Sequence, residues 1–350
     1  MFSASYTAHP LTFVRPAGTS RGVLRQKPCW FIQITGEDGI SGLGEVSVIP
    51  KLSLEDPDEC EIQIDHLCKL ISRDEMDPLQ ALPSMPGVQF ALETAMLDRK
   101  QGGERLLFPS EFTRGKVGIP TNGLIWMGAR DFMISQIREK MKLGFGVLKL
   151  KVGALDMKEE LQVLRWIRSE FDSSDLEIRL DANGSWDPSE AGGKMELFAR
   201  FDIHSIEQPI AAGQIEAMTE LCSNPVIPVA LDEELIGITG PEAKQALLQE
   251  IRPTYIILKP GLLGGFSMTG EWIRLADELK IGWWITSALE SNIGLNAIAQ
   301  WSWQLGVTRH QGLGTGALYT NNIPSPLHMS GEQLWFRPEK GWDLSDIFLS

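Results

Sequence analysis

The sequence predicts an α/β protein built around a (β/α)8-type barrel, with an α+β unit in front of it. Short extended, apolar runs recur from about residue 117 at steps of 25 to 31 residues, the spacing of one strand–helix unit. They lie near Ile119, Val147, Ile178, Ile203, Val229, Tyr255, Trp283 and His310. An open, doubly wound sheet would show the same alternation. However, no glycine-rich nucleotide-binding motif follows any of these runs.

Helical patterns fill most of the gaps between these runs. Asp156 is a predicted helix cap, because Glu159 follows three residues later and apolar residues then recur on one face. Pro241 opens a second predicted helix, and residues 271–280 lie in a third. The alternation of strand and helix therefore favours a parallel barrel sheet.

The first hundred residues predict a separate α+β unit. Extended residues 29–34 lead through a turn at 36–39 into a second extended stretch that ends at Glu45. Asp56-Pro57 begins a predicted helix, and a second helix covers about 88–100. We expect residues 1–110 to form a capping domain that the segment 321–350 completes, and residues 111–320 to form the barrel.

The composition excludes several classes of protein. The chain of 350 residues has 32 Lys and Arg against 46 Asp and Glu, a net charge of −14, which argues against nucleic acid as the partner. No apolar run reaches the length of a membrane helix, and the N-terminus lacks the pattern of a secretory signal. Four cysteines without a CxxC pair fit a reducing, cytoplasmic setting.

Histidines give no local support for a metal site. The five histidines form neither an HxH nor an HExxH pattern. Any metal chemistry must therefore use oxygen ligands.

The second barrel strand carries two lysines on one face. It reads Val147-Leu148-Lys149-Leu150-Lys151, and side chains alternate along a strand, so Lys149 and Lys151 point the same way. Leu150 suits the helix layer, which places both lysines inside the barrel. Two buried ammonium groups are costly unless anions lie opposite them.

Carboxylates stand at the ends of the next three strands. Asp181, Glu207 and Asp232, hereafter the carboxylate triplet, are spaced 26 and 25 residues apart, one per strand–helix unit. Three hard oxygen ligands on a rigid rim suit Mg²⁺, with Mn²⁺ as the alternative. We expect them to converge on one point, and Lys259 to end the sixth strand across the barrel from Lys151.

Each charged residue alone has a structural explanation, such as a helix cap, a turn or a solvated strand end. Their joint occurrence in register, at the strand ends where barrel enzymes place their active sites, favours catalysis.

The order KxK, DAN, EQP, DE and LKP resembles the enolase superfamily, in its muconate-lactonising subgroup, over nearly the whole chain. Within that subgroup, segments 18–22 (GTSRG), 261–266 (GLLGGF) and 287–291 (SALES) resemble the o-succinylbenzoate synthases of menaquinone synthesis. The resemblance implies a modified (β/α)7β barrel and a metal-dependent lyase that removes a proton α to a carboxylate.

The resemblance also implies roles for the matching residues. Lys151 matches the base and Lys149 the auxiliary lysine that tunes it. Lys259 matches a cation that faces the developing charge. The carboxylate triplet matches the metal ligands, and Asn183 supports that shell.

The implied reaction is the syn-dehydration of 2-succinyl-6-hydroxy-2,4-cyclohexadiene-1-carboxylate to o-succinylbenzoate. The metal takes one carboxylate of this dicarboxylate, and backbone N–H groups near Gly264, Gly265 or Ser287 are candidates for the other. Arg21 and the loop around 48–50 are expected to cover the site, as capping loops do in the family.

Two alternatives stay open. Lysines on both faces also permit a dipeptide or N-acylamino acid epimerase, although the dipeptide epimerases carry an Asp-x-Asp pair where this chain reads Ser287-Ala288-Leu289. Glu290 and Glu233 remain candidate partners for the ammonium group of a dipeptide. A barrel that binds a dicarboxylate or a metal without turnover is the alternative of another class, and the sequence leaves a homo-oligomer open.

Overall fold

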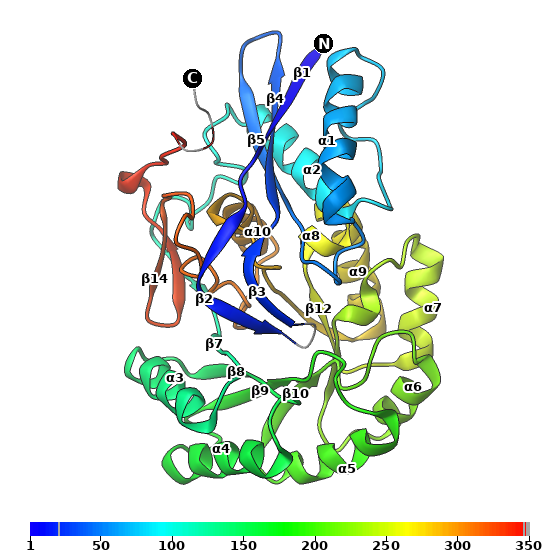
Figure 1. Cartoon of the computed structure of the whole chain (residues 1–350), viewed down its shortest axis with the longest axis vertical. Helices are drawn as coiled ribbons and strands as arrows, with labels where there is room; N and C mark the ends of the chain where they lie inside the picture. The colour runs from blue at the N-terminus through cyan, green and yellow to red at the C-terminus, as the bar shows by residue number, and fades with distance from the viewer. Residues whose placement is uncertain (20–21, 346, 348–350) are drawn as a thin grey trace.

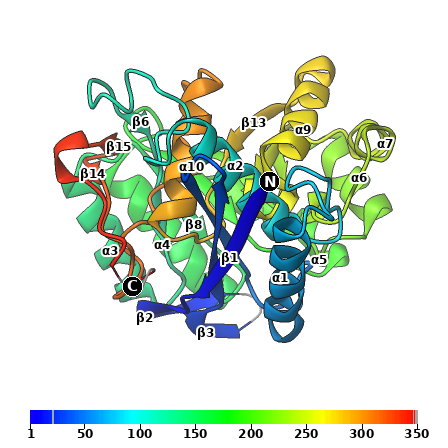
Figure 2. The ribbon, with the colours of Figure 1, turned by 90° about the horizontal axis from the view of Figure 1, so that it is seen from above.

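The computed structural model describes residues 1–19, 22–345 and 347. Long antiparallel strands and two helices form one part of the molecule, and a curled parallel sheet with helices outside it forms the other (Figure 1). Seen from above, helices flank the antiparallel strands on both sides (Figure 2). No helix in the described part of the chain is long and apolar enough to cross a membrane.

The N-terminal part is an antiparallel sheet covered by two helices. Strands β1 (Phe2–Ala8), β4 (Cys29–Gly36) and β5 (Ser41–Ser47) pair in the order β1-β4-β5. Helices α1 (Pro57–Ser72) and α2 (Pro86–Lys100) bury their apolar faces with this sheet in one core. Gly42 and Gly44 of β5 lie so close to the α2 backbone that a Cβ at either position would clash. Strands β2 (Leu11–Thr19) and β3 (Gly22–Lys27) form a separate hairpin.

The barrel sheet has seven parallel strands in sequence order. They are β7 (Gly123–Ile125), β8 (Val147–Lys151), β9 (Glu177–Asp181), β10 (Ile203–Glu207), β11 (Val229–Leu231), β12 (Tyr255–Leu258) and β13 (Gly282–Ile285). Helices lie outside the strands, and the largest apolar core of the molecule fills the space between the two layers.

Helices follow the strands in turn. They are α3 (Arg130–Lys142), α4 (Met157–Glu170), α5 (Pro188–Ala199), α6 (Ile215–Ser223), the 3-10 turn η1 (Glu233–Leu235), α7 (Pro241–Ile251), α8 (Pro260–Leu263), α9 (Gly265–Leu279) and α10 (Asn292–Gln304). The predicted caps are confirmed, because Asp56 and Asp156 each accept a backbone N–H bond in the first turn of α1 and α4.

The two ends of the barrel differ from the expected strands. Ile119 does not begin the first barrel strand. It lies in β6 (Ile119–Pro120), which pairs antiparallel with β15 (Gln333–Phe336), and the barrel strand starts at Gly123. The eighth strand expected near His310 is reduced to single bridges, from Gln311 to Thr121 and from Gly312 to Thr286. These bridges connect the seventh strand to the first, so the modified barrel closes with seven full strands.

The C-terminal segment contacts both parts of the molecule. Strand β14 (Leu327–Ser330) pairs with β15, β15 pairs in turn with β6, and the turn η2 (Pro338–Lys340) follows. Just before them, Asn321 accepts a bond from the Thr12 backbone N–H at 2.8 Å. The segment therefore links the hairpin β2–β3 to the barrel.

Candidate active site

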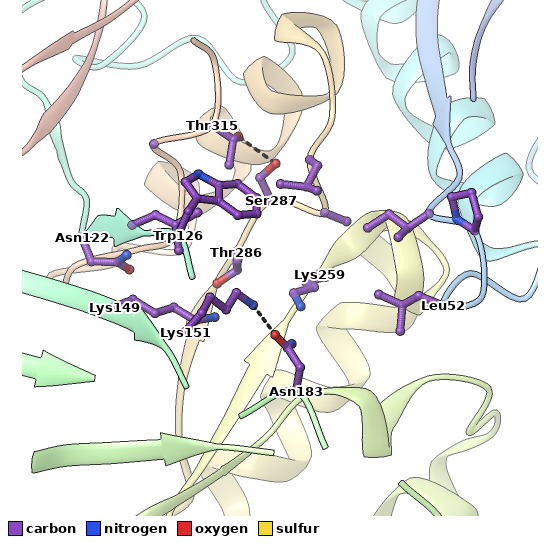
Figure 3. A pocket seen from close by; sticks show the side chains of 17 residues that line it. Leu52, Asn122, Trp126, Lys149, Lys151, Asn183, Lys259, Thr286, Ser287 and Thr315 are labelled. Carbon is purple, nitrogen blue, oxygen red and sulfur yellow. Dashed lines mark hydrogen bonds between the residues drawn. The ribbon is translucent and has the colours of Figure 1, made fainter. Parts of the chain in front are cut away.

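The carboxyl ends of β8 to β12 bring the charged residues together. Lys151 lies opposite Asp181 in the pairing of β8 with β9, and Asp181 lies opposite Glu207 in the pairing of β9 with β10. Lys149, Lys151 and Lys259, hereafter the three site lysines, extend into one cavity (Figure 3). The sequence prediction that these lysines and the carboxylate triplet share one site matches this arrangement.

Lys149 and Lys151 are both paired with carboxylates. The Nζ atom of Lys149 lies 2.8 Å from Asp181 Oδ2 and 2.6 Å from Glu207 Oε1. The Nζ atom of Lys151 donates to Asp181 Oδ2 at 2.6 Å and to Asn183 Oδ1 at 2.6 Å. Asn183, with a left-handed φ of 46°, also donates to Glu233 Oε1 at 3.1 Å. Its amide therefore connects the base candidate to the end of the fifth barrel strand.

Lys259 approaches from the other side of the cavity. It follows β12 directly and precedes α8, and its ammonium group donates to Asp232. Burial lowers the pKa of Lys259, but the charges of Asp232, Glu207 and Glu233 together outweigh burial and raise the pKa above the ordinary lysine value. Lys259 is therefore a cation at neutral pH.

Burial and charge compete at the other groups. Burial lowers the pKa of Lys149, but Asp181 and Glu207 outweigh this effect and raise it. Burial likewise favours protonation of Asp181, but Lys149 and Lys151 hold the pKa of Asp181 below its usual range. Burial, with the charge of Asp181 added, raises the pKa of Glu207 well above that of a free glutamate. The site thus sets three lysines against three carboxylates, and Glu207 is the carboxylate whose ionised form burial and Asp181 disfavour.

The donor set has the chemistry of a hard divalent cation site. Three buried carboxylates stand on adjacent strand ends, and oxygen ligands of this kind are those that Mg²⁺ prefers. Contrary to the expected convergence, no group of three or more His, Cys, Asp or Glu side chains in residues 1–19, 22–345 and 347 is arranged to hold a metal ion. The physical reason is that each carboxylate lies within hydrogen-bond distance of a lysine instead.

Apolar side chains form most of the remaining wall. Ile49, Pro50 and Leu52 reach the cavity from the loop after β5, so two of the three residues 48–50 line it as expected. Ala288 and Leu289 line it from the loop after β13. The cavity thus joins a charged floor at the strand ends to an apolar wall that includes part of the N-terminal unit.

Several lining residues escaped the sequence prediction. Asn122, Leu124 and Trp126 line the cavity from β7 and its flanks, and Thr286 and Thr315 line it near β13. The first three alternate along an extended segment, so they share one face. A correct start for the first barrel strand would have identified them.

The predicted substrate contacts have different outcomes. Ser287 lines the cavity, but its backbone N–H donates to Gly312 O at 3.0 Å and its hydroxyl donates to Glu290 Oε2 at 2.5 Å. Gly264 and Gly265 are not among the lining residues: Gly264 joins α8 to α9 and Gly265 begins α9, with φ of 91° and 78°. The expectation for Arg21 lies outside the described residues.

No carboxylate is among the described residues that line the cavity. Glu290 is fully buried and turned toward Ser287, and Glu233 accepts from Asn183 without lining the cavity. Neither candidate partner for a substrate ammonium group therefore faces the cavity.

Comparison with known proteins gives consistent matches. Residues 133–341 match the family described as enolase C-terminal domain-like. The chain is 47% identical to the o-succinylbenzoate synthase of Desulfotalea psychrophila, over 93% of this chain and 97% of that protein. The crystal structure of MenC from D. psychrophila superposes with a TM-score of 0.84 at 43% identity, over 95% of this chain and 99% of that one. An L-Ala-D/L-Glu epimerase of Francisella tularensis is more distant, at 28% identity over 54% of this chain and 52% of that protein.

Proposed function

The chain belongs to the enolase superfamily, and we propose that it catalyses the o-succinylbenzoate synthase reaction. In this reaction 2-succinyl-6-hydroxy-2,4-cyclohexadiene-1-carboxylate loses water to give o-succinylbenzoate, a step of menaquinone synthesis. The observation that carries the proposal is the 47% identity to such a synthase, which extends over nearly the whole of both chains. The protein is accordingly a lyase that acts on a small molecule.

The lysines divide the chemistry between two sides of the cavity. Lys151 is the base that takes the proton α to the ring carboxylate, and the same ammonium group can return a proton to the departing hydroxyl in a syn elimination. Lys149 is held between Asp181 and Glu207, and it places a fixed positive charge beside Lys151. Lys259 stays protonated, and its positive charge faces the negative charge that develops on the substrate.

The carboxylate triplet would hold a divalent cation, Mg²⁺ in the first place and Mn²⁺ as the alternative. Enolase-superfamily enzymes are generally Mg²⁺-dependent, and the three buried carboxylates on adjacent strand ends support the same requirement. When bound, the cation supplies Lewis-acid stabilisation of the substrate carboxylate. Asn183 supports this shell, because its backbone N–H donates to Asp181 Oδ1 at 3.0 Å.

Neutral donors are proposed for the succinyl carboxylate. Thr286 Oγ1 and Asn122 Oδ1 are buried at the cavity without a hydrogen-bond partner in the described structure. The Thr286 hydroxyl can donate to an anion, and so can the Asn122 Nδ2 group, although Asn122 Oδ1 only accepts. Ser287 already donates its hydroxyl to Glu290. We propose Thr286 and Asn122 as substrate contacts in place of the turn at 264–265.

The lining argues against a dipeptide as the substrate. A dipeptide has an α-ammonium group, which is costly to bury without an anionic partner. The described lining offers three lysines and no carboxylate, so it suits a dicarboxylate better.

Product analysis tests the proposed function. The purified protein with Mg²⁺ is incubated separately with the cyclohexadiene acid, with a panel of dipeptides and with N-acylamino acids, and the products are identified by NMR. We expect o-succinylbenzoate from the first substrate, and slow or no deuterium exchange at the α-carbon of the dipeptides. Dipeptide epimerisation at a comparable kcat/KM, with dehydration slow or absent, would overturn the proposal.

A further inference from the structure

Gln208 joins two carboxylate-bearing strand ends without lining the cavity. It directly follows Glu207 in the EQP segment and is fully buried. We propose that Gln208 is a positioning residue that fixes Glu207 and Asp232 relative to each other. This inference deepens the proposed function and rests on it, because the two carboxylates are proposed to hold the cation.

The side chain of Gln208 uses its full hydrogen-bonding capacity. Its Oε1 atom accepts from the backbone N–H of Asp232 at 3.0 Å and of Glu234 at 3.2 Å. Its Nε2 atom donates to Ile210 O at 3.1 Å and to Glu234 Oε2 at 3.0 Å. A primary amide has two N–H donors and two acceptor sites on oxygen, and all four are occupied here.

The backbone of Gln208 links three consecutive strand ends. Its N–H donates to Ala230 O of β11 at 2.9 Å, and its carbonyl accepts from the Gly184 N–H, after β9, at 2.7 Å. Its φ of 40° is left-handed, although the residue is not glycine and precedes a proline, Pro209. Such a conformation is unfavourable for a residue with a side chain and persists only where the surroundings hold it. The bonds around Gln208 supply that restraint.

These bonds act on the groups that do the chemistry. The Gln208 backbone continues directly into Glu207, whose Oε1 lies 2.6 Å from Lys149 Nζ. The Gln208 amide oxygen holds the backbone N–H of Asp232, whose carboxylate pairs with Lys259. One side chain therefore sets the offset between carboxylates that neutralise lysines on both sides of the cavity.

The amide group itself is required, because both kinds of bond are used. A methionine at this position fills a similar volume but leaves the N–H groups of Asp232 and Glu234 without an acceptor. A glutamate keeps the acceptor, but its second oxygen would face Ile210 O and Glu234 Oε2 as a like charge or dipole. Both substitutions should therefore displace Glu207 and Asp232 from their present offset.

The test compares Gln208→Met and Gln208→Glu with a matched control, Gln300→Met. Gln300 is also fully buried, and its side chain accepts from the Phe108 N–H and donates to Arg105 O and Asn296 Oδ1, far along helix α10 from the carboxylates. Mg²⁺ alone is titrated into each metal-depleted protein by calorimetry. In parallel, kcat, KM and the thermal midpoint are measured for each.

We expect both Gln208 variants to lose about 10- to 100-fold in Mg²⁺ affinity, as for partners of metal ligands elsewhere, and to lose kcat with it. Gln300→Met should lower the thermal midpoint while Mg²⁺ affinity and kcat stay at the wild-type value. If Gln208→Met fails to fold, Gln208→Glu decides.

Wild-type Mg²⁺ affinity and kcat in the folded Gln208 variants would overturn the positioning role while the proposed function stands. A wild-type protein that neither binds Mg²⁺ nor forms o-succinylbenzoate would instead overturn the proposed function, and this inference with it.

Discussion

At the scale of single residues, we propose that the charge of Lys259 faces the reacting carbon from the side opposite Lys151. Lys259→Ala should lower kcat by about 10²- to 10³-fold, the usual loss when one preorganised electrostatic donor is removed. Steady-state kinetics with the cyclohexadiene acid measure this. A kcat within a few-fold of wild type would contradict the assigned role.

Lys244 provides the matched control for Lys259. It is another fully buried lysine, and it donates to Glu271 Oε2 at 2.6 Å and to Met268 O at 2.9 Å, outside the site. Lys244→Met should lower the free energy of unfolding, because it removes the buried partner of the half-exposed Glu271, and should leave kcat unchanged. The comparison separates lost charge in the cavity from general loss of stability.

The titration of Glu290 makes the stability of the folded protein depend on pH. Burial raises its pKa above the ordinary glutamate value, against the lowering effects of Ser287 and Lys27. A carboxyl with a raised folded-state pKa binds its proton more tightly in the folded protein. Its contribution to stability is therefore complete below the unfolded pKa of about 4.3 and is lost as the pH rises through the folded value.

Glu290→Gln removes this titration and keeps the shape of the side chain. Urea unfolding of both proteins at pH 5 and pH 8 should show that wild type is more stable relative to the variant at pH 5 than at pH 8. A difference that stays constant, or changes in the opposite direction, would contradict the direction assigned to Glu290.

The sequence alone predicts which charged residues lie together, but it does not predict the residues that position them. Alternation along β8 and the regular spacing of strand ends predict that Lys149, Lys151 and the carboxylate triplet share a site, because period and register are sequence properties. The bonds of Gln208 to Asp232 and Glu234 depend on a left-handed backbone that no local pattern indicates. No local pattern indicates the hydrogen bond from Ser287 to Glu290 either.

At the scale of elements, the loop between β5 and α1 completes the cavity. Leu52 lines the apolar wall, so Leu52→Ala removes contact area that the substrate keeps throughout the reaction. We expect a loss of about 1–2 kcal/mol in binding, which is a 5- to 30-fold rise in KM, with kcat nearly unchanged.

Leu54 is the control for Leu52, because it belongs to the same loop, is 45% exposed and does not line the cavity. Leu54→Ala should leave both constants near wild type. An equal effect of the two substitutions, or a fall in kcat alone for Leu52→Ala, would argue against a binding role for this loop.

Helices that begin with a capping residue could be predicted from the sequence. Strands that depend on a pairing partner far away in the chain could not. The caps at Asp56 and Asp156 identify their helices because a side chain bonds within its own first turn. Ile119 is as apolar as a barrel strand requires, but it pairs with β15 from the far end of the chain. The eighth strand is only a pair of bridges, whose existence depends on the closure of the barrel itself.

At the scale of the whole molecule, the N-terminal unit and the barrel share one cavity. Residues from the loop after β5, from β8 and from the loop after β13 line it together. The division into a capping domain of residues 1–110 with 321–350 and a barrel of residues 111–320 remains our proposal. The family match over residues 133–341 and the fold described here support the enolase-superfamily architecture.

The proposed metal binding should affect the stability of the whole folded molecule as well as its turnover. A cation that binds only the folded state stabilises it by about 2.7 kcal/mol at 100 times its dissociation constant. We expect chelation to abolish turnover and lower the thermal midpoint, and added Mg²⁺ to restore both in wild type but not in Asp232→Asn. Activity that survives exhaustive chelation would contradict the proposed metal site.

The most direct test of the central claim is the turnover of the cyclohexadiene acid by wild type and Lys151→Ala, measured side by side in the presence of Mg²⁺. Wild type should convert it with a kcat/KM in the enzymatic range of about 10⁴–10⁸ M⁻¹s⁻¹. Lys151→Ala should lose at least about 10²- to 10⁴-fold in kcat, the contribution of a positioned base, while its circular dichroism spectrum stays that of wild type. A folded Lys151→Ala protein with a kcat near wild type, or a wild-type protein that does not dehydrate this acid, would contradict the account.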